Sequence, residues 1–182
     1  VLVVDDASPD GTGKMLDELV SGDPQVQILH RPRKMGVGSA HKLALQHARD
    51  ANYPYLITMD ADFSHHPRYL RTMRDRLNDS EFVTGSRYIS GGRCDYGPRR
   101  QLLSRSANFL ARLVLGLGLA ENTTLYRGFT GSLLSRLDID RIRSDGYSFA
   151  VDSLREISRV TESLSEFPIH FEDRTAGDSK IS

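Results

Sequence analysis

Residues 53–67, YPYLITMDADFSHHP, decide the fold and indicate where its site lies. The apolar run YPYLIT is typical of a buried strand, and Asp60 and Asp62 follow it within a few residues. With one alanine between them, the two carboxylates point to the same side of an extended chain, where both reach one hard cation. A solvated turn is the alternative, because D-x-D triplets are common. The position after a buried strand favours a Mg²⁺ or Mn²⁺ site.

Short apolar strands and amphipathic helices alternate on both sides of this stretch. The alternation predicts an α/β fold in which helices join the strands of a parallel sheet, and ligands of such sheets bind at the carboxyl ends of the strands. Asp5 and Asp6 end the first strand, so we expect them at the same sheet edge as Asp60 and Asp62. The predicted strands are 1–4, 26–30, 53–60, 81–88 and 164–174, and the predicted helices are 10–22, 38–51, 68–78, 99–119 and 146–160.

The composition is that of one globular domain without a strong overall charge. The chain has 182 residues, of which 38% are hydrophobic, with 24 basic and 24 acidic residues. No global field draws it to nucleic acid, so attraction to an anion must come from local patches. Cys94 has no partner for an internal disulfide, and we give it no catalytic role. Because the chain begins inside a strand, we expect residues 1–182 to be a single domain that is a fragment of a longer protein.

Three further loops are candidates for a site, each with a structural alternative. In DDASPDGT, residues 5–12, a carboxylate of Asp5 or Asp6 is suited to read a nucleotide base, whereas the following residues suit a helix cap. KMGVGSA, residues 34–40, resembles a phosphate-binding loop, but tight packing of the loop is an equal alternative. His65 and His66 lack a third metal ligand at a suitable spacing. We expect His65 to pack within or support its loop and His66 to be exposed.

Basic residues at the ends of elements supply the other half of an anion site. Arg87, Arg100, Arg174 and Lys180 all fall at such positions, where guanidinium and ammonium groups bind phosphate well. The segment 99–119 also combines arginines with leucines. It is a candidate helix for the surface of a membrane, although its leucines are equally suited to pack on the sheet.

The ordered series VVDDASPDGT, MDADFSHHP, TGSRYISGG, RQLLSRSAN, GYSFAVD and FPIHFEDRTAGDSK resembles the dolichol-phosphate (polyprenyl-phosphate) mannose synthase family of inverting family 2 glycosyltransferases. The resemblance covers almost the whole chain. It implies a nucleotide-sugar-binding glycosyltransferase A-type fold, with a mixed, mostly parallel sheet and helices on both faces. It also implies one catalytic domain, 1–182, that lacks the family's opening strand and anything C-terminal.

The same resemblance implies roles for individual residues. Asp5 or Asp6 contacts the nucleotide, and Asp60 and Asp62 with Ser64 organise the metal; the residues implied to hold donor and acceptor phosphates are Arg87, Arg100, Ser104, Arg174 and Lys180. Asp60, Asp62, Arg87 and Arg174 are thereby the catalytic candidates. One departure concerns a T-S-G-F-R type motif of relatives. Read on its glycine–aromatic pair, TTLYRGFTG places Thr130 where relatives have arginine and Arg127 before the glycine.

The implied reaction is metal-assisted transfer of mannose from GDP-mannose to a polyprenyl (dolichyl) monophosphate with inversion. An acceptor phosphate is already an oxyanion near neutral pH, so no general base is required. Two alternatives stay open: a UDP-glucose-dependent enzyme, and a catalytically silent nucleotide-sugar-binding domain. The implied location is cytoplasmic, peripheral at the inner face of a bacterial inner membrane or of the endoplasmic reticulum. A membrane-anchor domain or subunit outside this chain is a further expected partner.

Overall fold

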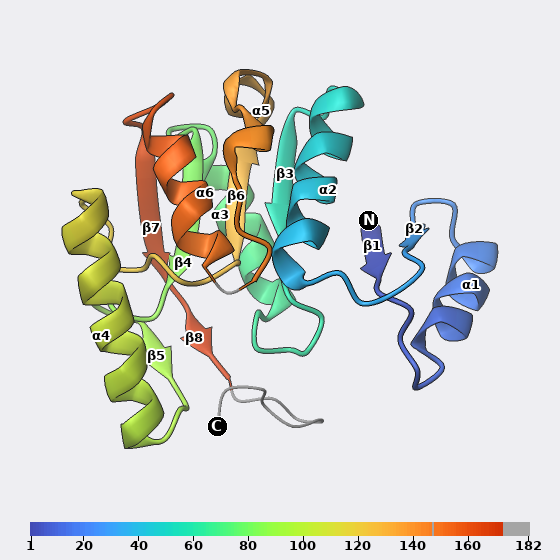
Figure 1. The fold of residues 1–182 in the computed structure, drawn as a ribbon, viewed down its shortest axis with the longest axis horizontal. Coiled ribbons are helices and arrows are strands. Elements are labelled where there is room, and N and C mark those ends of the chain that lie inside the picture. The colour runs from blue at the N-terminus through green and yellow to red at the C-terminus, as the bar shows by residue number, and fades with distance from the viewer. Residues whose placement is uncertain (147, 173–182) are drawn as a thin grey trace.

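A mixed four-stranded sheet forms the centre of the protein, whose computed structural model describes residues 1–146 and 148–172. The strand order is β3 (Tyr55–Thr58), β6 (Arg127–Thr130), β4 (Phe82–Ser86) and β7 (Leu164–Pro168). β6 runs antiparallel to both of its neighbours, whereas β4 and β7 are parallel (Figure 1).

Helices cover both faces of this sheet, as predicted. Because neighbouring residues of a strand point to opposite faces, Phe82 and Val83 of β4 belong to two separate cores. The covering helices are α2 (Val37–Asp50), α3 (Leu70–Arg76), α5 (Gly131–Arg136) and α6 (Phe149–Ser158). Phe82 packs in the core that includes residues of α2, α5 and α6, and Val83 packs with Met73 of α3.

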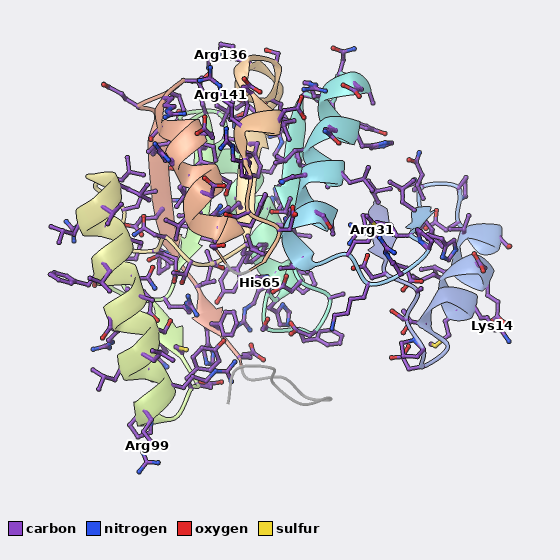
Figure 2. All side chains as sticks on the ribbon, in the orientation of Figure 1. Lys14, Arg31, His65, Arg99, Arg136 and Arg141 are labelled. Atoms are coloured by element: carbon purple, nitrogen blue, oxygen red, sulfur yellow. The ribbon has the colours of Figure 1, made fainter. Side chains whose placement is uncertain are left out.

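The first 36 residues form a parallel β–α–β unit beside this body. It consists of β1 (Leu2–Asp5), α1 (Thr12–Gly22) and β2 (Gln27–His30), and within residues 1–36 only Asp5 and Arg31 are buried. Figure 2 shows Arg31 between this unit and α2. Its guanidinium pairs with Asp6 and donates to Ser39 Oγ at 2.5 Å. Polar contacts around Arg31 therefore help to hold the unit to the body.

A long helix, α4 (Pro98–Leu115), lies at the other side of the molecule (Figure 1). Near its base, β5 (Arg93–Cys94) pairs with β8 (His170–Phe171) in parallel. Two short 3₁₀ helices, Pro67–Tyr69 and Ile139–Arg141, complete the elements of the described chain. None of the helices within 1–146 and 148–172 has the length and apolar character needed to cross a bilayer.

The structure corrects three details of the predicted elements. β6 and α5 were not predicted, and both antiparallel pairings of the central sheet involve β6. The predicted strand 164–174 is divided at the buried Ile169 into β7 and β8. The helix predicted to reach residue 119 ends at Leu115, because Gly116 takes a left-handed conformation with φ of 66°.

Candidate active site

The D-x-D pair lies in the loop that leaves the carboxyl end of β3. Asp62 Oδ1 accepts hydrogen bonds from Ser64, at 3.2 Å from its backbone N–H and at 2.5 Å from its hydroxyl. Phe63, between them, has a left-handed φ of 63°, which closes the turn. Asp60 is 35% exposed, whereas Ser64 is buried. Ser64 therefore orients Asp62, and a direct contact between Ser64 and a metal stays a prediction.

His65 is buried and holds this loop in place through hydrogen bonds of its ring. Its ring is 1% exposed and stacks on Tyr126, with ring centroids 4.9 Å apart. The backbone N–H of Asp60 donates to Nδ1 at 2.9 Å, so the proton of the neutral ring lies on Nε2, which donates to Thr124 Oγ1 at 3.1 Å. Burial lowers the pKa of His65 to about 4, which keeps the ring neutral. The supporting role predicted for His65 is confirmed.

His66 differs from its prediction. The residue is half-buried rather than exposed, and its Nδ1 accepts a hydrogen bond from the backbone N–H of Arg68 at 3.1 Å. It thus caps the 3₁₀ turn Pro67–Tyr69. A side chain that caps a helix end is not available as a metal ligand through the same nitrogen.

Two carboxylates suit a divalent ion that also binds a diphosphate. Within residues 1–146 and 148–172, no group of three or more His, Cys, Asp or Glu side chains forms a complete metal site. Mg²⁺ and Mn²⁺ commonly use one or two protein carboxylates and complete their shell with phosphate oxygens and water. Asp60 and Asp62 therefore fit a metal that arrives with its nucleotide sugar.

The two nucleotide candidates have different surroundings. Asp5 is buried and accepts from the Ser8 backbone N–H at 3.3 Å. Hydrogen bonding from Ser8, opposed by burial, lowers the pKa of Asp5. Asp6 pairs with Arg31 and also accepts from the Met35 N–H at 3.1 Å. Asp6 thus holds the neighbouring loops together. Asp5 is also engaged, since His30 Nδ1 lies 3.5 Å from its Oδ2, so contact of either carboxylate with a base stays a prediction.

The glycine loop 34–40 is a packing loop. The N–H of Gly38 already donates to the Asp145 carbonyl at 2.9 Å. A Cβ at Gly38 would lie 2.8 Å from atoms of Asp145 and Phe149, so only glycine fits there. Packing against Asp145 and Phe149 therefore explains the glycine at position 38.

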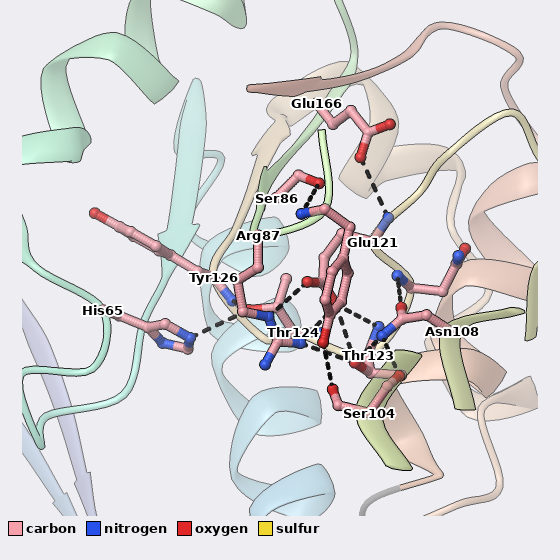
Figure 3. A network of polar contacts seen from close by, with 12 residues as sticks. His65, Ser86, Arg87, Ser104, Asn108, Glu121, Thr123, Thr124, Tyr126 and Glu166 are labelled. Carbon is pink, nitrogen blue, oxygen red and sulfur yellow. Dashed lines mark hydrogen bonds and ion pairs between the residues drawn. The ribbon is translucent and has the colours of Figure 1, made fainter. Parts of the chain in front are cut away.

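Arg87 lies at the end of β4 in a buried ion pair that the sequence did not indicate (Figure 3). Its Nε and Nη2 donate to the two carboxylate oxygens of Glu121 at 2.7 and 2.8 Å, and Glu121 is fully buried. Nη2 also donates to Thr123 Oγ1 at 3.0 Å. Arg87 thus fixes the loop that enters β6. Its predicted contact with a phosphate stays a prediction.

Polar residues on the inner side of α4 extend this network. Asn108 donates to Thr123 Oγ1 at 3.0 Å, and its Oδ1 accepts from the Asn122 N–H at 2.6 Å. Ser104 Oγ accepts from the Tyr88 hydroxyl at 2.6 Å. The network therefore connects α4 to the ends of β4 and β6, as Figure 3 shows.

The remaining phosphate candidates are only partly described. The guanidinium carbon of Arg100 lies 3.7 Å from the centroid of the Tyr96 ring, which places Arg100 near the foot of α4. Arg174 and Lys180 lie outside the described residues. The structure thus brings Arg87 and Ser104 into one network through Tyr88, Thr123 and Asn108, and leaves the late basic pair as a prediction.

The structure gives structural contacts to the two residues singled out in TTLYRGFTG. Thr130 begins α5, where its hydroxyl accepts from the Leu133 N–H at 3.2 Å. Arg127 is 2% exposed and donates to Ser153 Oγ at 2.8 Å; burial lowers its pKa to about 9. Both residues thus hold elements of the fold together, and the departure from the family motif stays as the sequence gives it.

Sequence reasoning missed Glu121, Asn108 and His41. His41 of α2 stacks against Phe149 with ring centroids 5.7 Å apart, and burial lowers its pKa to about 4. After burial, the charges of Asp60, Arg127 and His65 also act on the pKa of His41. None of the three lies in a recognisable motif. Glu121 is the one charged residue between Arg112 and Arg127, which was the one available signal.

Comparison with known proteins identifies the family. Residues 1–137 match the sequence profile described as glycosyl transferase family 2. The chain belongs to this family. It is 39% identical over 183 residues to the undecaprenyl-phosphate mannosyltransferase of Micrococcus luteus, a match that covers 100% of this chain and 75% of the relative. It is 38% identical over 185 residues to the polyprenol monophosphomannose synthase of Mycolicibacterium smegmatis, covering 100% of this chain and 70% of the relative.

Solved structures support the glycosyltransferase A-type fold. Glucosyl-3-phosphoglycerate synthase from Mycobacterium tuberculosis, in complex with Mn²⁺, UDP-glucose and phosphoglyceric acid, matches with a TM-score of 0.64 at 18% identity, over 98% of this chain and 60% of that chain. The complex of the same enzyme with UDP matches with a TM-score of 0.62 at 18% identity, over 99% of this chain and 61% of that chain. At this identity the likeness shows the fold alone. The chain thus spans about 60% of the length of these structures.

Proposed function

We propose that this family 2 glycosyltransferase moves mannose from GDP-mannose to a polyprenyl monophosphate with inversion at the anomeric carbon. The observation that carries the proposal is the D-x-D loop at the end of β3, which Ser64 and His65 hold in place. Similarity over the whole of this chain, and over 70–75% of the relatives, to two enzymes named for polyprenyl-phosphate mannosyl transfer supports the sugar and the acceptor. Mannose transfer is preferred to glucose transfer because the relatives that share 38–39% identity carry the mannose names.

The residues of this chain perform binding and orientation rather than proton transfer. A phosphate oxygen of the acceptor attacks the anomeric carbon as the bond from that carbon to the diphosphate oxygen breaks, and the nucleoside diphosphate leaves with the electron pair. The attacking oxygen is already ionised, so the step needs no general base. Asp60 and Asp62 would hold a divalent ion, which supplies charge stabilisation on the leaving diphosphate. Asp5 would contact the base of the donor.

Helix α4 offers the membrane contact that a lipid acceptor requires. Six large apolar side chains on its outer side are 58–79% exposed, and no Asp or Glu occurs in the helix. Its inner side is bound to the body through Ser104 and Asn108. Figure 2 shows that side chains on the outer side of α4 point away from the molecule. We infer that this outer side, with Leu102, Leu103, Phe109, Leu110, Leu113 and Val114, rests on a membrane surface.

Calorimetric titration tests the metal and donor assignments together. The full chain is titrated with GDP-mannose and with UDP-glucose, first with Mn²⁺ and then with a chelator. We expect Mn²⁺-dependent binding of GDP-mannose, lost in Asp62→Asn and retained in Asp75→Asn, a matched change at an exposed position of α3. Preference for UDP-glucose would change the product, and failure to bind either donor would favour a silent module. Equal binding by Asp62→Asn would remove Asp62 from the metal site.

A further inference from the structure

A hollow beside the N-terminal half of α4 is lined by two arginines that the proposed function does not use. The hollow has a volume of about 340 Å³ and lies between β5 and α4. Arg93 of β5 and Arg105 of α4 are both exposed and both line it. Two guanidinium groups at the wall of one small hollow repel each other, and a bound anion would relieve that repulsion.

Neither guanidinium has a polar partner within the described chain. Over residues 1–146 and 148–172, Arg93 and Arg105 make no ion pair and no side-chain hydrogen bond; Arg105 only lies 6.0 Å from the centroid of the Tyr88 ring. Arg87 at the wall is already paired with Glu121. The one carboxylate at the wall, Asp95, is directed to His170 Nε2 at 2.7 Å. Among the described residues, neither of these two guanidinium groups therefore has a counter-charge in direct contact.

The hollow borders the exposed apolar side of α4. Arg105 follows Leu102 by three residues and precedes Phe109 by four, so the three side chains are neighbours on one side of the helix. Leu102 and Phe109 are 69% and 67% exposed. An amphiphile with its phosphate in the hollow would lay its acyl chains along this apolar side. A free phosphate would use the arginines but leave the apolar side uncovered.

We propose that the hollow between Arg93 and Arg105 binds the headgroup phosphate of an anionic membrane phospholipid. The proposal rests on the membrane contact of α4 proposed above. Neither arginine is itself an acceptor candidate, although Arg87 and Tyr88, the hydrogen-bond partner of Ser104, also line the hollow. Arg100 and Arg105 are five residues apart, which places them about 140° apart around the helix. The lipid would fix the orientation of α4 on the bilayer while the acceptor enters from the other flank.

Vesicle co-sedimentation of the full chain tests the site. The variants are Arg93→Gln, Arg105→Gln and, as the matched control, Arg112→Gln, which removes the same charge from an exposed position of α4 outside the hollow. Diffuse attraction to phosphatidylglycerol vesicles costs about fivefold in partition for each arginine lost. We expect both hollow variants to lose at least about threefold more than this control, and pure phosphatidylcholine vesicles to show no such difference. Equal losses in all three variants would overturn the proposal.

Two further arms separate the lipid from other sources of phosphate. Glycerol phosphate in solution is added as a competitor. If its binding depends on Arg93 and Arg105 while the variants bind vesicles like the wild type, the hollow binds a soluble phosphate and not a lipid. Mannosyl transfer to a short, water-soluble prenyl phosphate is also measured. We expect it to be unchanged within about twofold in both variants, and a larger loss would place the hollow in the acceptor site. If the wild type transfers no sugar, the vesicle result still decides the lipid site.

Discussion

At the scale of the residue, the buried histidines make stability depend on pH. His65 and His41 each have a pKa of about 4 in the folded protein because burial disfavours their charged forms, against about 6.5 when unfolded. The unfolded chain therefore binds more protons as the pH falls from about 6.5 to 4, and stability falls with it. For His65 alone the full loss is about 3 kcal/mol. We expect His65→Gln to flatten this acid loss, measured by urea unfolding at several pH values.

His30 provides a control of opposite sign. A hydrogen bond to Asp17 raises the pKa of His30, so its contribution to stability is present at low pH and is lost as the pH rises. His30→Gln should therefore steepen the acid loss that His65→Gln flattens. An acid dependence of His65→Gln identical to that of the wild type would contradict the buried neutral ring.

The ion pair between Arg87 and Glu121 gives a second prediction at this scale. Glu121→Gln leaves the buried Arg87 charge without its counter-charge, and breaking such a pair costs about 3–5 kcal/mol. Denaturant unfolding should show a loss of this size. The double variant Arg87→Met with Glu121→Leu removes both charges and should lose less than Glu121→Gln. A loss below about 1 kcal/mol in Glu121→Gln would show that the pair is not structurally required.

Sequence reasoning reached some residues of the site and not others for a physical reason. Asp60, Asp62 and His65 come directly after an apolar strand, so their position at the sheet edge could be predicted from the sequence. The burial of Glu121 and Arg127 could not be predicted, because charged residues are rarely buried and no residue near them in the sequence indicates a partner. Burial of these two groups is decided by contacts with distant elements, such as that of Arg127 with Ser153 of α6.

At the scale of the element, α4 is predicted to bind membranes through side chains that contribute little to folding. Leu113 and Val114 are 71% and 79% exposed. Leu113→Gln with Val114→Gln should change the free energy of unfolding by less than about 0.5 kcal/mol. The same double variant should lower partition onto vesicles at least about tenfold, because burial of each side chain in a bilayer contributes on the order of 1 kcal/mol or more.

Met15→Gln is the matched control for α4. Met15 is 70% exposed on α1, at the opposite side of the molecule from α4 (Figure 1). Its replacement should leave vesicle partition unchanged. If the α4 variant instead unfolds the protein or leaves partition unchanged, its leucines serve packing or another contact, and the proposed orientation on the membrane is wrong.

The helices were easier to predict than the strands. Amphipathic periodicity located α1, α2 and α6 to within a few residues, although only α2 and α6 bury apolar side chains. β6, with the sequence RGFT, lacks that signal because it begins with a buried arginine and a glycine. Met73 of α3 lies 2.9 Å from where a Cβ at Gly128 would be, so the glycine is required by close packing. Packing of this kind involves a distant helix and cannot be predicted from the four residues of β6.

At the scale of the whole molecule, α/β alternation predicted the layers correctly but not all of the pairing. The β–α–β unit of residues 1–36 is parallel, as expected, and helices cover both faces of the central sheet. The two antiparallel pairings of β6 were not predicted, because strand direction depends on how the chain returns from α4. The carboxyl ends of β1 and β3 point the same way in Figure 1, which agrees with the predicted shared edge.

The contrast between the two parts of the molecule gives a last prediction. The β–α–β unit buries no apolar side chain within residues 1–36, whereas every residue of β4 is buried between β6 and β7. Local opening should therefore cost less free energy in the unit, and its amide protons at Leu2–Asp5 should exchange at least about tenfold faster than those at Phe82–Ser86.

GDP-mannose with Mn²⁺ should slow exchange at Asp5 and leave β4 unchanged, because the donor adds contacts to the less stable part. Hydrogen exchange followed by mass spectrometry measures both effects. Equal exchange in the two strands would mean that the polar contacts of Arg31 and Asp6 hold the unit as firmly as the apolar cores hold the sheet.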